Sequence, residues 1–428
     1  MTRTTLLRSF DVGSDLAVLA AESAGVCIRP YVRTVTDRAT GESTSVPIPC
    51  GSTREAVCSP CATKARRLRM HQCREGWHRT DADQPTDVLD DPDEDEQLDD
   101  EPDTKDEEDA ELDDESEEGL VRRVRSTRRL DGLPDLPTVP MQDRTTGRVF
   151  TDPSTGATFR PSMFLTLTLP SYGKVIPGRG IPADSGRYDY RRAALDALLW
   201  PRLLDRFWQN LRRCAGYKVQ YFSAIEAQRR LAPHLHAAVR GAIPRRVIKA
   251  VTRATYYAAW RPPLDRVVYD RDTGWPVWDQ KTQTYVDPGT GEALPSWEEA
   301  TEDLDEPAHV VRFGTQVDIK GLLGGTEDSD RTVRYLCKYL TKNVADTYAD
   351  ENADWSDAYQ RHTDRLHAEV RRLPCSPGCA NWLRHGVTPN DPGPGLVPGQ
   401  CSSPANDREN LGLGGRRVWS LDNGPARP

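Results

Sequence analysis

The sequence predicts an α+β fold, an antiparallel sheet with helices packed on one face of it. Leucines alternate with threonines in residues 162–171 (SMFLTLTLPS), the period-two pattern of a strand with one buried face. Apolar residues recur at every fourth position from 195 to 211, as on a helix that buries one stripe. Residues 218–228 and 234–239 are strand-like and joined by a short turn, which indicates an antiparallel hairpin. This mixture favours the α+β class.

The first long helix is expected over residues 190–216. Pro201 lies inside it and is expected to kink or restart the helix, because proline lacks the N–H that a helix interior uses. Gly216 lies close to its end, where glycine commonly terminates helices.

The later elements follow in chain order. A second helix is expected over residues 245–260, a hairpin-rich insertion over about 261–306, and one strand over 308–321. A last helix is expected over 328–346. Its start has three candidate capping residues, Asp328, Ser329 and Asp330.

The formal net charge of −9 averages two very different parts of the chain. Residues 81–118 contain 23 acidic residues and one lysine, a net charge of −22, so the rest of the chain carries +13. The acidic segment has no aromatic residues and few apolar ones, which predicts a disordered linker. A basic body of this kind is typical of proteins that bind polyanions such as nucleic acids.

The sequence indicates a cytoplasmic protein. No apolar run approaches the 18 residues of a transmembrane helix, and aspartates interrupt the apolar N-terminal stretch, so neither a membrane partner nor a signal peptide is expected. In reducing cytosol the ten cysteines are expected to be thiols or metal ligands.

The helix over 328–346 presents two very different faces. Its apolar residues form one stripe: Val333, Leu336, Cys337, Leu340 and Val344. The opposite face carries two tyrosines and three cations: Tyr335, Tyr339, Arg331, Lys338 and Lys342. Tyrosines one turn apart can simply pack on each other, but packing tyrosines belong beside the apolar stripe. Phenol hydroxyls among cations suit attack on a phosphodiester, with Lys338 stabilising developing negative charge.

Two histidines, His234 and His236, lie one residue apart in the strand-like segment HLHAAV. Residues two apart on a strand share a face, so both imidazoles can bind one divalent cation. Two polar residues on a solvent-facing strand surface are the ordinary alternative. Glu226, on the first strand of the hairpin, can face the two histidines.

The motifs FLTLTLP, HLH and YLCKYLTK, in this order on strand, strand and helix, resemble the three motifs of HUH endonucleases, specifically rolling-circle replication initiators. The longer segments AIEAQRRLAPHLHAAVRGAIPR, VVRFGTQVDIKG, CSPGCANWLRHG and NLGLGGRRV resemble the RepSA-type initiators of actinobacterial plasmids and integrative elements. The resemblance covers most of the chain. It implies an HUH endonuclease core.

The resemblance implies metal-dependent nicking of one DNA strand at a plasmid origin. The two histidines would bind Mg²⁺ or Mn²⁺ with Glu226, or with Gln228 in its place. Tyr335 or Tyr339 would keep the 5′ phosphate as a covalent phosphotyrosine, and the other tyrosine would perform the closing strand transfer. Independently of the resemblance, we expect DNA phosphates to contact the basic surface, at Arg331, Lys342, Arg229 and Arg230.

The sequence contains two cysteine groups. Cys50, Cys58, Cys61 and Cys73 include one CxxC and match a structural zinc site, in which His71 or His78 can replace one ligand. The second group, a weaker match to a zinc site, comprises Cys375, Cys379, His385 and Cys401. Free buried thiols are the alternative for both.

These features divide the chain into four regions. Residues 1–80 form a basic, cysteine-rich zinc-binding module and residues 81–120 the acidic linker. Residues 121–350 form the nickase domain, and residues 351–428 a cysteine-containing C-terminal region.

Two other functions compete with plasmid replication initiation. One is a zinc-containing DNA-binding regulator without catalysis, and the other is a relaxase or transposase that uses the same HUH chemistry. The chain has no GxxxxGK[ST] motif, so an initiator of this kind needs a separate host helicase, besides a polymerase and single-stranded origin DNA as partners. The oligomeric state stays open.

Overall fold

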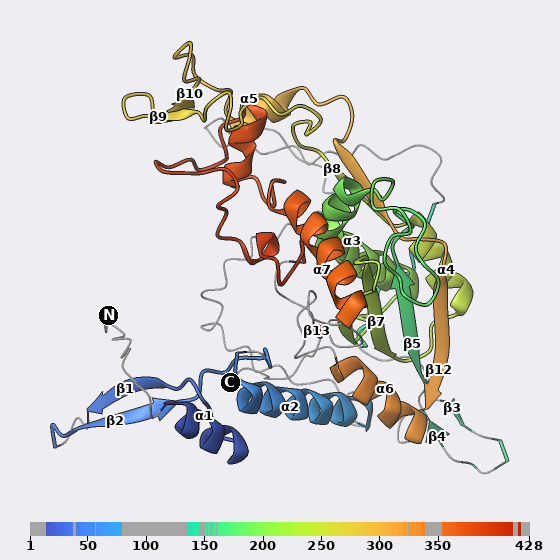
Figure 1. The fold of residues 1–428 in the computed structure, drawn as a ribbon. Coiled ribbons are helices and arrows are strands. Elements are labelled where there is room, and N and C mark those ends of the chain that lie inside the picture. Colours follow the sequence, from blue (N-terminus) through green and yellow to red (C-terminus); the bar gives the residue numbers. More distant parts are fainter. Residues whose placement is uncertain are drawn as a thin grey trace, which may run out of the picture.

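A five-stranded antiparallel sheet forms the centre of the computed structural model (Figure 1). The structure describes residues 14–36, 40–55, 57–78, 135–144, 150–151, 153–154, 156, 158–159, 161–323, 326–338, 353–413 and 418–420. Within them the strand order is β12 (Val317–Leu323), β5 (Pro161–Thr168), β7 (Pro233–Arg240), β6 (Tyr221–Ala227) and β13 (Val418–Ser420). The expected antiparallel hairpin is confirmed as β6 and β7, and β7 is the middle strand.

Helices cover both faces of this sheet, which corrects the expectation of one covered face. On β7, Leu235, Ala237 and Val239 point into the main core with α3 (Tyr190–Ala215) and α4 (Arg245–Ala254). Ala238 points the other way, against α6 (Glu327–Lys338). The two faces differ because successive strand residues alternate in direction.

The long helix α3 confirms the apolar stripe. Leu195, Leu199, Leu203, Phe207 and Leu211 are all buried. The helix runs through Pro201 without a break and ends at Gly216, whose φ of 69° lies in the left-handed region that favours glycine. The expected restart at the proline is therefore wrong.

Two expected elements are divided in the structure. Residues 245–260 form α4 and then β8 (Tyr256–Ala259), because Thr255 adopts extended backbone and two tyrosines that favour strands follow it. The expected strand 308–321 is β11 (His309–Arg312), which pairs with β8, and β12, which pairs with β5. Gly314 lies at the break, where its N–H donates to the carbonyl of Thr168.

The helix that carries Tyr335 begins one residue earlier than expected. The hydroxyl of Thr326 accepts from the amide of Ser329 (3.3 Å), so Thr326 has the capping role assigned to Asp328, Ser329 or Asp330. Val333, Leu336 and Cys337 are fully buried, as the stripe predicts. Residues 339–346 lie outside the described part of the chain.

The N-terminal module packs against α6. It consists of α1 (Ser14–Ser23), the hairpin of β1 (Tyr31–Thr36) and β2 (Ser43–Ile48), and α2 (Ser59–His78). Figure 1 shows α2 running beside α6, and Met70 of α2 packs against the cluster that contains Val333, Leu336 and Cys337. The acidic linker, residues 81–120, lies outside the described residues.

The insertion and the C-terminal region pack against the part of the chain that contains the five-stranded sheet. The insertion contains β9 (Val277–Asp279), β10 (Thr284–Val286) and α5 (Trp297–Glu302), and its Tyr285 shares a small core with Leu383 of the 3₁₀ helix η2 (Ala380–His385). The C-terminal helix α7 (Ala353–Val370) lies along α3. The chain then passes through a second 3₁₀ helix, η3 (Pro404–Asn406), and β13 pairs with β6 at the sheet edge. A short hairpin of β3 (Phe150–Thr151) and β4 (Thr158–Phe159) precedes the sheet.

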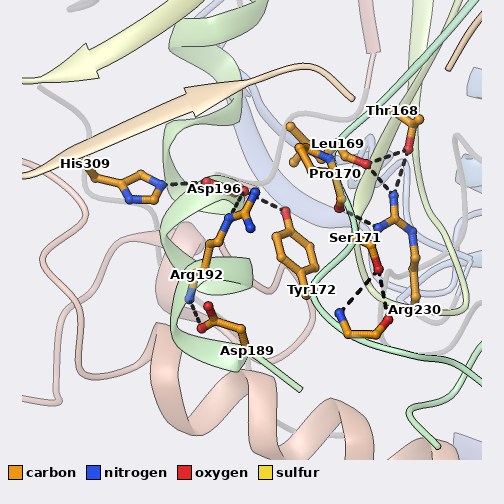
Figure 2. A network of polar contacts seen from close by, with 11 residues as sticks. Thr168, Leu169, Pro170, Ser171, Tyr172, Asp189, Arg192, Asp196, Arg230 and His309 are labelled. Atoms are coloured by element: carbon orange, nitrogen blue, oxygen red, sulfur yellow. Dashed lines mark hydrogen bonds and ion pairs between the residues drawn. The ribbon is translucent and has the colours of Figure 1, made fainter. Parts of the chain in front are cut away.

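A buried carboxylate links α3 to two neighbouring segments. Asp196 accepts hydrogen bonds from the hydroxyl of Tyr172 (2.9 Å) and from Nε2 of His309 (2.6 Å), as Figure 2 shows. Burial and the charge of Asp196 raise the pKa of Tyr172. The contacts fasten the loop after β5 and strand β11 to the same helix turn.

Among the residues that the structure describes, no helix combines the length and apolar character needed to cross a bilayer.

We predict that the core-facing leucines of β5 dominate the stability of the sheet. Leu165→Ala should lower the free energy of unfolding by about 2–5 kcal/mol, because Leu165 is fully buried and its loss leaves a cavity. Val277→Ala is the matched control, because this side chain is 54% exposed and should change stability by less than about 0.5 kcal/mol. Chemical denaturation of both variants measures the difference, and equal stabilities would contradict this packing.

Candidate active site

The two histidines of β7 face α6, together with polar side chains from the neighbouring strands. His234 lies opposite Thr168 of β5 and Glu226 of β6, and His236 lies opposite Thr166 of β5. Directly paired residues on adjacent strands point to the same face, so strand register alone gathers these side chains.

The hydroxyl of Tyr335 lies at the centre of this group. It donates to Oε2 of Glu226 (3.1 Å) and lies 3.2 Å from Nε2 of His236. Glu226 Oε2 and His236 Nε2 are themselves 3.0 Å apart. His236 is 7% exposed, whereas Tyr335 is 37% exposed. The structure thus brings together one predicted nucleophile and two predicted metal ligands, with the tyrosine on the solvent side.

His236 is held by aromatic packing and by a hydroxyl. Its ring stacks on Phe164 with an interplanar angle of 10°, and Nδ1 lies 3.2 Å from the hydroxyl of Thr166. A hydroxyl can donate or accept, so Thr166 can support either neutral tautomer of His236. Phe164 and Thr166 were not predicted as site residues from the sequence. The alternating pattern FLTLT could have identified them, because every second residue of this strand faces the histidines.

His234 contacts Gln228, the alternative ligand, through its Nδ1 atom (2.6 Å to Nε2 of Gln228). Burial, reinforced by the nearby His236, lowers the pKa of His234 to about 4. The ring is therefore neutral at physiological pH, which is the form that binds cations. Asp318 of β12, opposite Thr166 and thus on the same face, is an acidic neighbour that the sequence reading missed.

The side chains of His234, His236 and Glu226 have the chemistry of ligands for a divalent cation. Nε2 of His234 is buried and has no hydrogen-bond partner among the described residues. Two imidazoles with a carboxylate are ligands that Mn²⁺ accepts. The ligand atoms of His234, His236 and Glu226 do not all lie within 4.8 Å of one another. These side chains would therefore have to move closer together to bind one ion. Oε1 of Gln228 accepts from Arg230, so the NH₂ group of Gln228 faces Nδ1 of His234. Binding of a cation at Nε2 of His234 would require this amide to turn its oxygen toward Nδ1–H.

The guanidinium of Arg230 is engaged in hydrogen bonds within the protein, so Arg230 has a structural role and is not an exposed phosphate-binding residue. Its guanidinium donates to the carbonyls of Pro170 (2.7 Å) and Leu169 (2.7 Å) and to the hydroxyl of Thr168 (2.9 Å), as Figure 2 shows. Its Nε donates to Oε1 of Gln228 (2.6 Å). Arg230 therefore connects the end of β5 to the residue that contacts His234, and it positions the site.

The other predicted site residues are placed only in part. Arg331 is exposed on α6 and forms ion pairs with Glu327 and Asp328, and Arg229 reaches the carbonyl of Gly178 (3.4 Å). Lys338 ends α6, with its side chain outside the described part. Tyr339 and Lys342 lie outside it entirely.

The N-terminal cysteine group has Cys27 where Cys73 was expected. The Sγ atoms of Cys27, Cys50, Cys58 and Cys61 lie mutually within 4.8 Å, so this group can hold a metal ion. Cys27 and Cys50 flank the β1–β2 hairpin, whose antiparallel pairing returns the chain to its start. Cys58 and Cys61 lie at the start of α2. Cys73, His71 and His78 lie farther along this helix, and the side chains of Cys73 and His78 are outside the described part.

The second cysteine group is formed without His385. The Sγ atoms of Cys375, Cys379 and Cys401 lie mutually within 4.8 Å and can also hold a metal ion. Nδ1 of His385 lies instead 2.8 Å from the carbonyl of Arg266, at the far end of η2. The expected fourth ligand is therefore wrong: the short helix carries His385 away from the cysteines.

Comparison with known proteins identifies the family. The model of the RepSA family, described as "Replication initiator protein, pSAM2", matches residues 15–420, so the chain belongs to this family of replication initiators. A "Replication initiator protein" of Streptomyces ambofaciens is 26% identical over 229 residues, which cover 44% of this chain and 43% of that protein. The alignment thus spans less than half of the relative's length. No solved structure matches the chain.

We predict that Arg230→Lys destabilises the protein and Arg229→Lys does not. A lysine cannot reach four separated acceptors, so the free energy of unfolding should fall by about 2–4 kcal/mol. The neighbouring Arg229 is the control, with an expected change below about 0.5 kcal/mol. Denaturant titration compares the two variants, and a fully stable Arg230→Lys protein would refute the structural role.

We also predict that Cys27, and not Cys73, completes the N-terminal metal site. Cys27→Ser should remove about one zinc ion per chain from purified protein, because a thiolate ligand is lost. Cys73→Ser should leave the zinc content unchanged. Elemental analysis by mass spectrometry measures both, and the reverse pattern would restore the grouping expected from the sequence.

Proposed function

We propose that this protein is a rolling-circle plasmid replication initiator that nicks single-stranded origin DNA through a covalent phosphotyrosine. The observation that carries the proposal is the hydroxyl of Tyr335, 3.1 Å from Glu226 and 3.2 Å from His236. The RepSA family match and the resemblance of the three motifs to HUH endonucleases support it.

In the proposed reaction Tyr335 is the nucleophile. Its Oη attacks the phosphorus of the scissile phosphodiester, the bond from phosphorus to the 3′ oxygen breaks, and the phenol proton ends on that oxygen. The products are a 3′ hydroxyl, which can prime a polymerase, and a 5′ phosphate attached to Tyr335. In the closing transfer, Tyr339 would attack a second phosphodiester and release its 3′ hydroxyl. That hydroxyl would attack the phosphorus bonded to Tyr335, displace the phenol oxygen and rejoin the strand.

His234, His236 and Glu226 would hold a bound Mg²⁺ or Mn²⁺, whose role is to withdraw charge from a non-bridging phosphate oxygen. The chain's own contribution is orientation. Phe164 and Thr166 fix the ring of His236, and Arg230 fixes Gln228 next to His234. The exposed edge of Tyr335 leaves room for a strand to approach.

Substrate binding in this proposal relies on unpaired DNA. A tyrosine that is only 37% exposed, on a helix packed against a sheet, is reached more easily by a single strand than by a duplex. Arg331 and Lys342 would contact the phosphates, and exposed aromatic side chains would stack on bases. A separate host helicase would unwind the template.

We predict that Tyr335→Phe abolishes covalent attachment to DNA. With Mn²⁺ and single-stranded fragments of its own replicon, the protein should form an adduct that survives denaturation, and the variant should lower initial adduct formation at least about a thousandfold. Tyr217→Phe is the matched control, because its buried hydroxyl has no hydrogen-bond partner in the described part of the chain and its loss should leave adduct formation unchanged.

Two further outcomes separate the competing functions. Tight DNA binding without any adduct, with Mg²⁺ or Mn²⁺, would favour a DNA-binding regulator. Equal cleavage of unrelated single strands would contradict origin specificity. EDTA should prevent the adduct in every nicking variant.

A further inference from the structure

Cys375 and Cys379, which are close in sequence, and the more distant Cys401 lie together in the C-terminal region, beyond the end of α7. Cys375 follows α7, Cys379 precedes η2, and Cys401 precedes η3. Their Sγ atoms lie mutually within 4.8 Å, and those of Cys375 and Cys401 are 3.7 Å apart. The DNA strand transfer proposed above involves no thiol, so these three cysteines must have another role.

The sulfur spacing matches a shared metal ion. A tetrahedral zinc site with Zn–S bonds of about 2.3 Å separates its sulfur atoms by about 3.8 Å. A disulfide would place the two sulfurs about 2.05 Å apart. In the N-terminal group, Sγ atoms of Cys27 and Cys58 are 3.9 Å apart, so both groups have the same spacing. Thiols are weak hydrogen-bond donors and acceptors, and hydrogen bonding alone gives little reason to gather three of them.

The backbone around the three cysteines is fixed by a buried amide. Asn381, fully buried, donates to the carbonyls of Arg371 (3.0 Å) and Leu373 (2.9 Å). Its Oδ1 accepts from the amide of Gly399 (2.7 Å). These contacts tie the segments before Cys375 and before Cys401 to η2, so the ligand positions are set before a metal arrives.

A second buried amide extends this support. Asn406 donates to the carbonyls of Val370 (3.3 Å) and Leu373 (3.4 Å), which joins η3 to the end of α7. The segment between α7 and η3 has little regular secondary structure. A metal ion bound by the three cysteines would hold its parts together, in addition to the hydrogen bonds of Asn381 and Asn406.

We propose that Cys375, Cys379 and Cys401 bind one zinc ion as thiolates, with a water molecule as the fourth ligand. Binding releases the three thiol protons to solvent. Cys379 is 2% exposed, whereas Cys375 and Cys401 are half-buried, so the open coordination position lies on their side. Among the described residues no fourth cysteine, histidine or carboxylate joins the group.

The two zinc sites would therefore differ in chemistry. The N-terminal site has four thiolates and is closed, whereas the C-terminal site has three and an exchangeable position. The C-terminal ion would fasten the end of α7 to the segment that leads to η3 and to β13, the strand that pairs with β6 beside Ala224.

The experiment is a count of zinc per chain in protein purified under reducing conditions, without added metal. The unmodified chain should contain about two zinc ions, and Cys379→Ser and Cys58→Ser should each contain about one. Cys214→Ser is the control and should contain two, because Cys214 is buried on α3 outside both groups. Cys401→Ser removes a less buried ligand of the same site and should also contain about one zinc ion. The conclusion therefore does not depend on the folding of Cys379→Ser alone.

Cobalt substitution then tests the ligand set. Each variant should lose the sulfur-to-cobalt charge-transfer absorption of its own site. Because the C-terminal site has three thiolates and the N-terminal site four, the loss in Cys379→Ser should be about three quarters of the loss in Cys58→Ser. An unmodified chain that contains only one zinc ion, with the same zinc content in Cys379→Ser, would overturn the proposal. A disulfide between Cys375 and Cys401 in protein purified under reducing conditions, found by alkylation and mass spectrometry, would overturn it too. Neither readout depends on DNA nicking.

Discussion

The antiparallel pairing of β7 with β5 and β6 determines where the polar side chains of these three strands lie in the active-site candidate. Because strand side chains alternate in direction, His234 and His236 can face α6 only while Leu235 and Ala237 enter the main core. A shift of one residue in register would exchange these sets and bury both histidines among leucines. The large apolar core beneath β7 therefore fixes the register, and the register places the histidines beside Glu226 and Thr166.

The position of Tyr335 depends on a second packing surface. Helix α6 buries Val333, Leu336 and Cys337 between the sheet and α2, with Phe222 and Ala238 on one side and Met70 on the other. The N-terminal cysteine site lies at the start of α2, and Arg54 forms an ion pair with Glu409 of the C-terminal region. Regions that the sequence separates by an acidic linker thus meet around the helix that carries the tyrosine. A metal ion at the N-terminal site would hold the first turn of α2 in place and so support α6 from outside.

Local patterns predicted the sheet strands, the apolar stripe of α3 and the two faces of α6, because each depends on residues close in sequence. They failed where distant contacts decide. Cys27 joins the N-terminal cysteine group only because a hairpin returns Cys50 to it. The sequence DRATG at residues 37–41, a pattern typical of hairpin turns, could have suggested this link. Arg230 looks like a surface cation in sequence, but three carbonyl or hydroxyl groups from β5 and the following loop surround it. His385 matched a ligand by composition, whereas the direction of η2 took it elsewhere.

The central claim is that the phenol oxygen of Tyr335 becomes bonded to DNA. Peptide mapping by mass spectrometry, after the unmodified protein has reacted with Mn²⁺ and a single-stranded fragment of its replicon, tests it most directly. The account predicts a peptide that contains Tyr335 with a nucleotide 5′ phosphate on its side chain. Attachment to a different residue from the first round of cleavage, or a cut strand that bears a free 5′ phosphate and no protein, would contradict it.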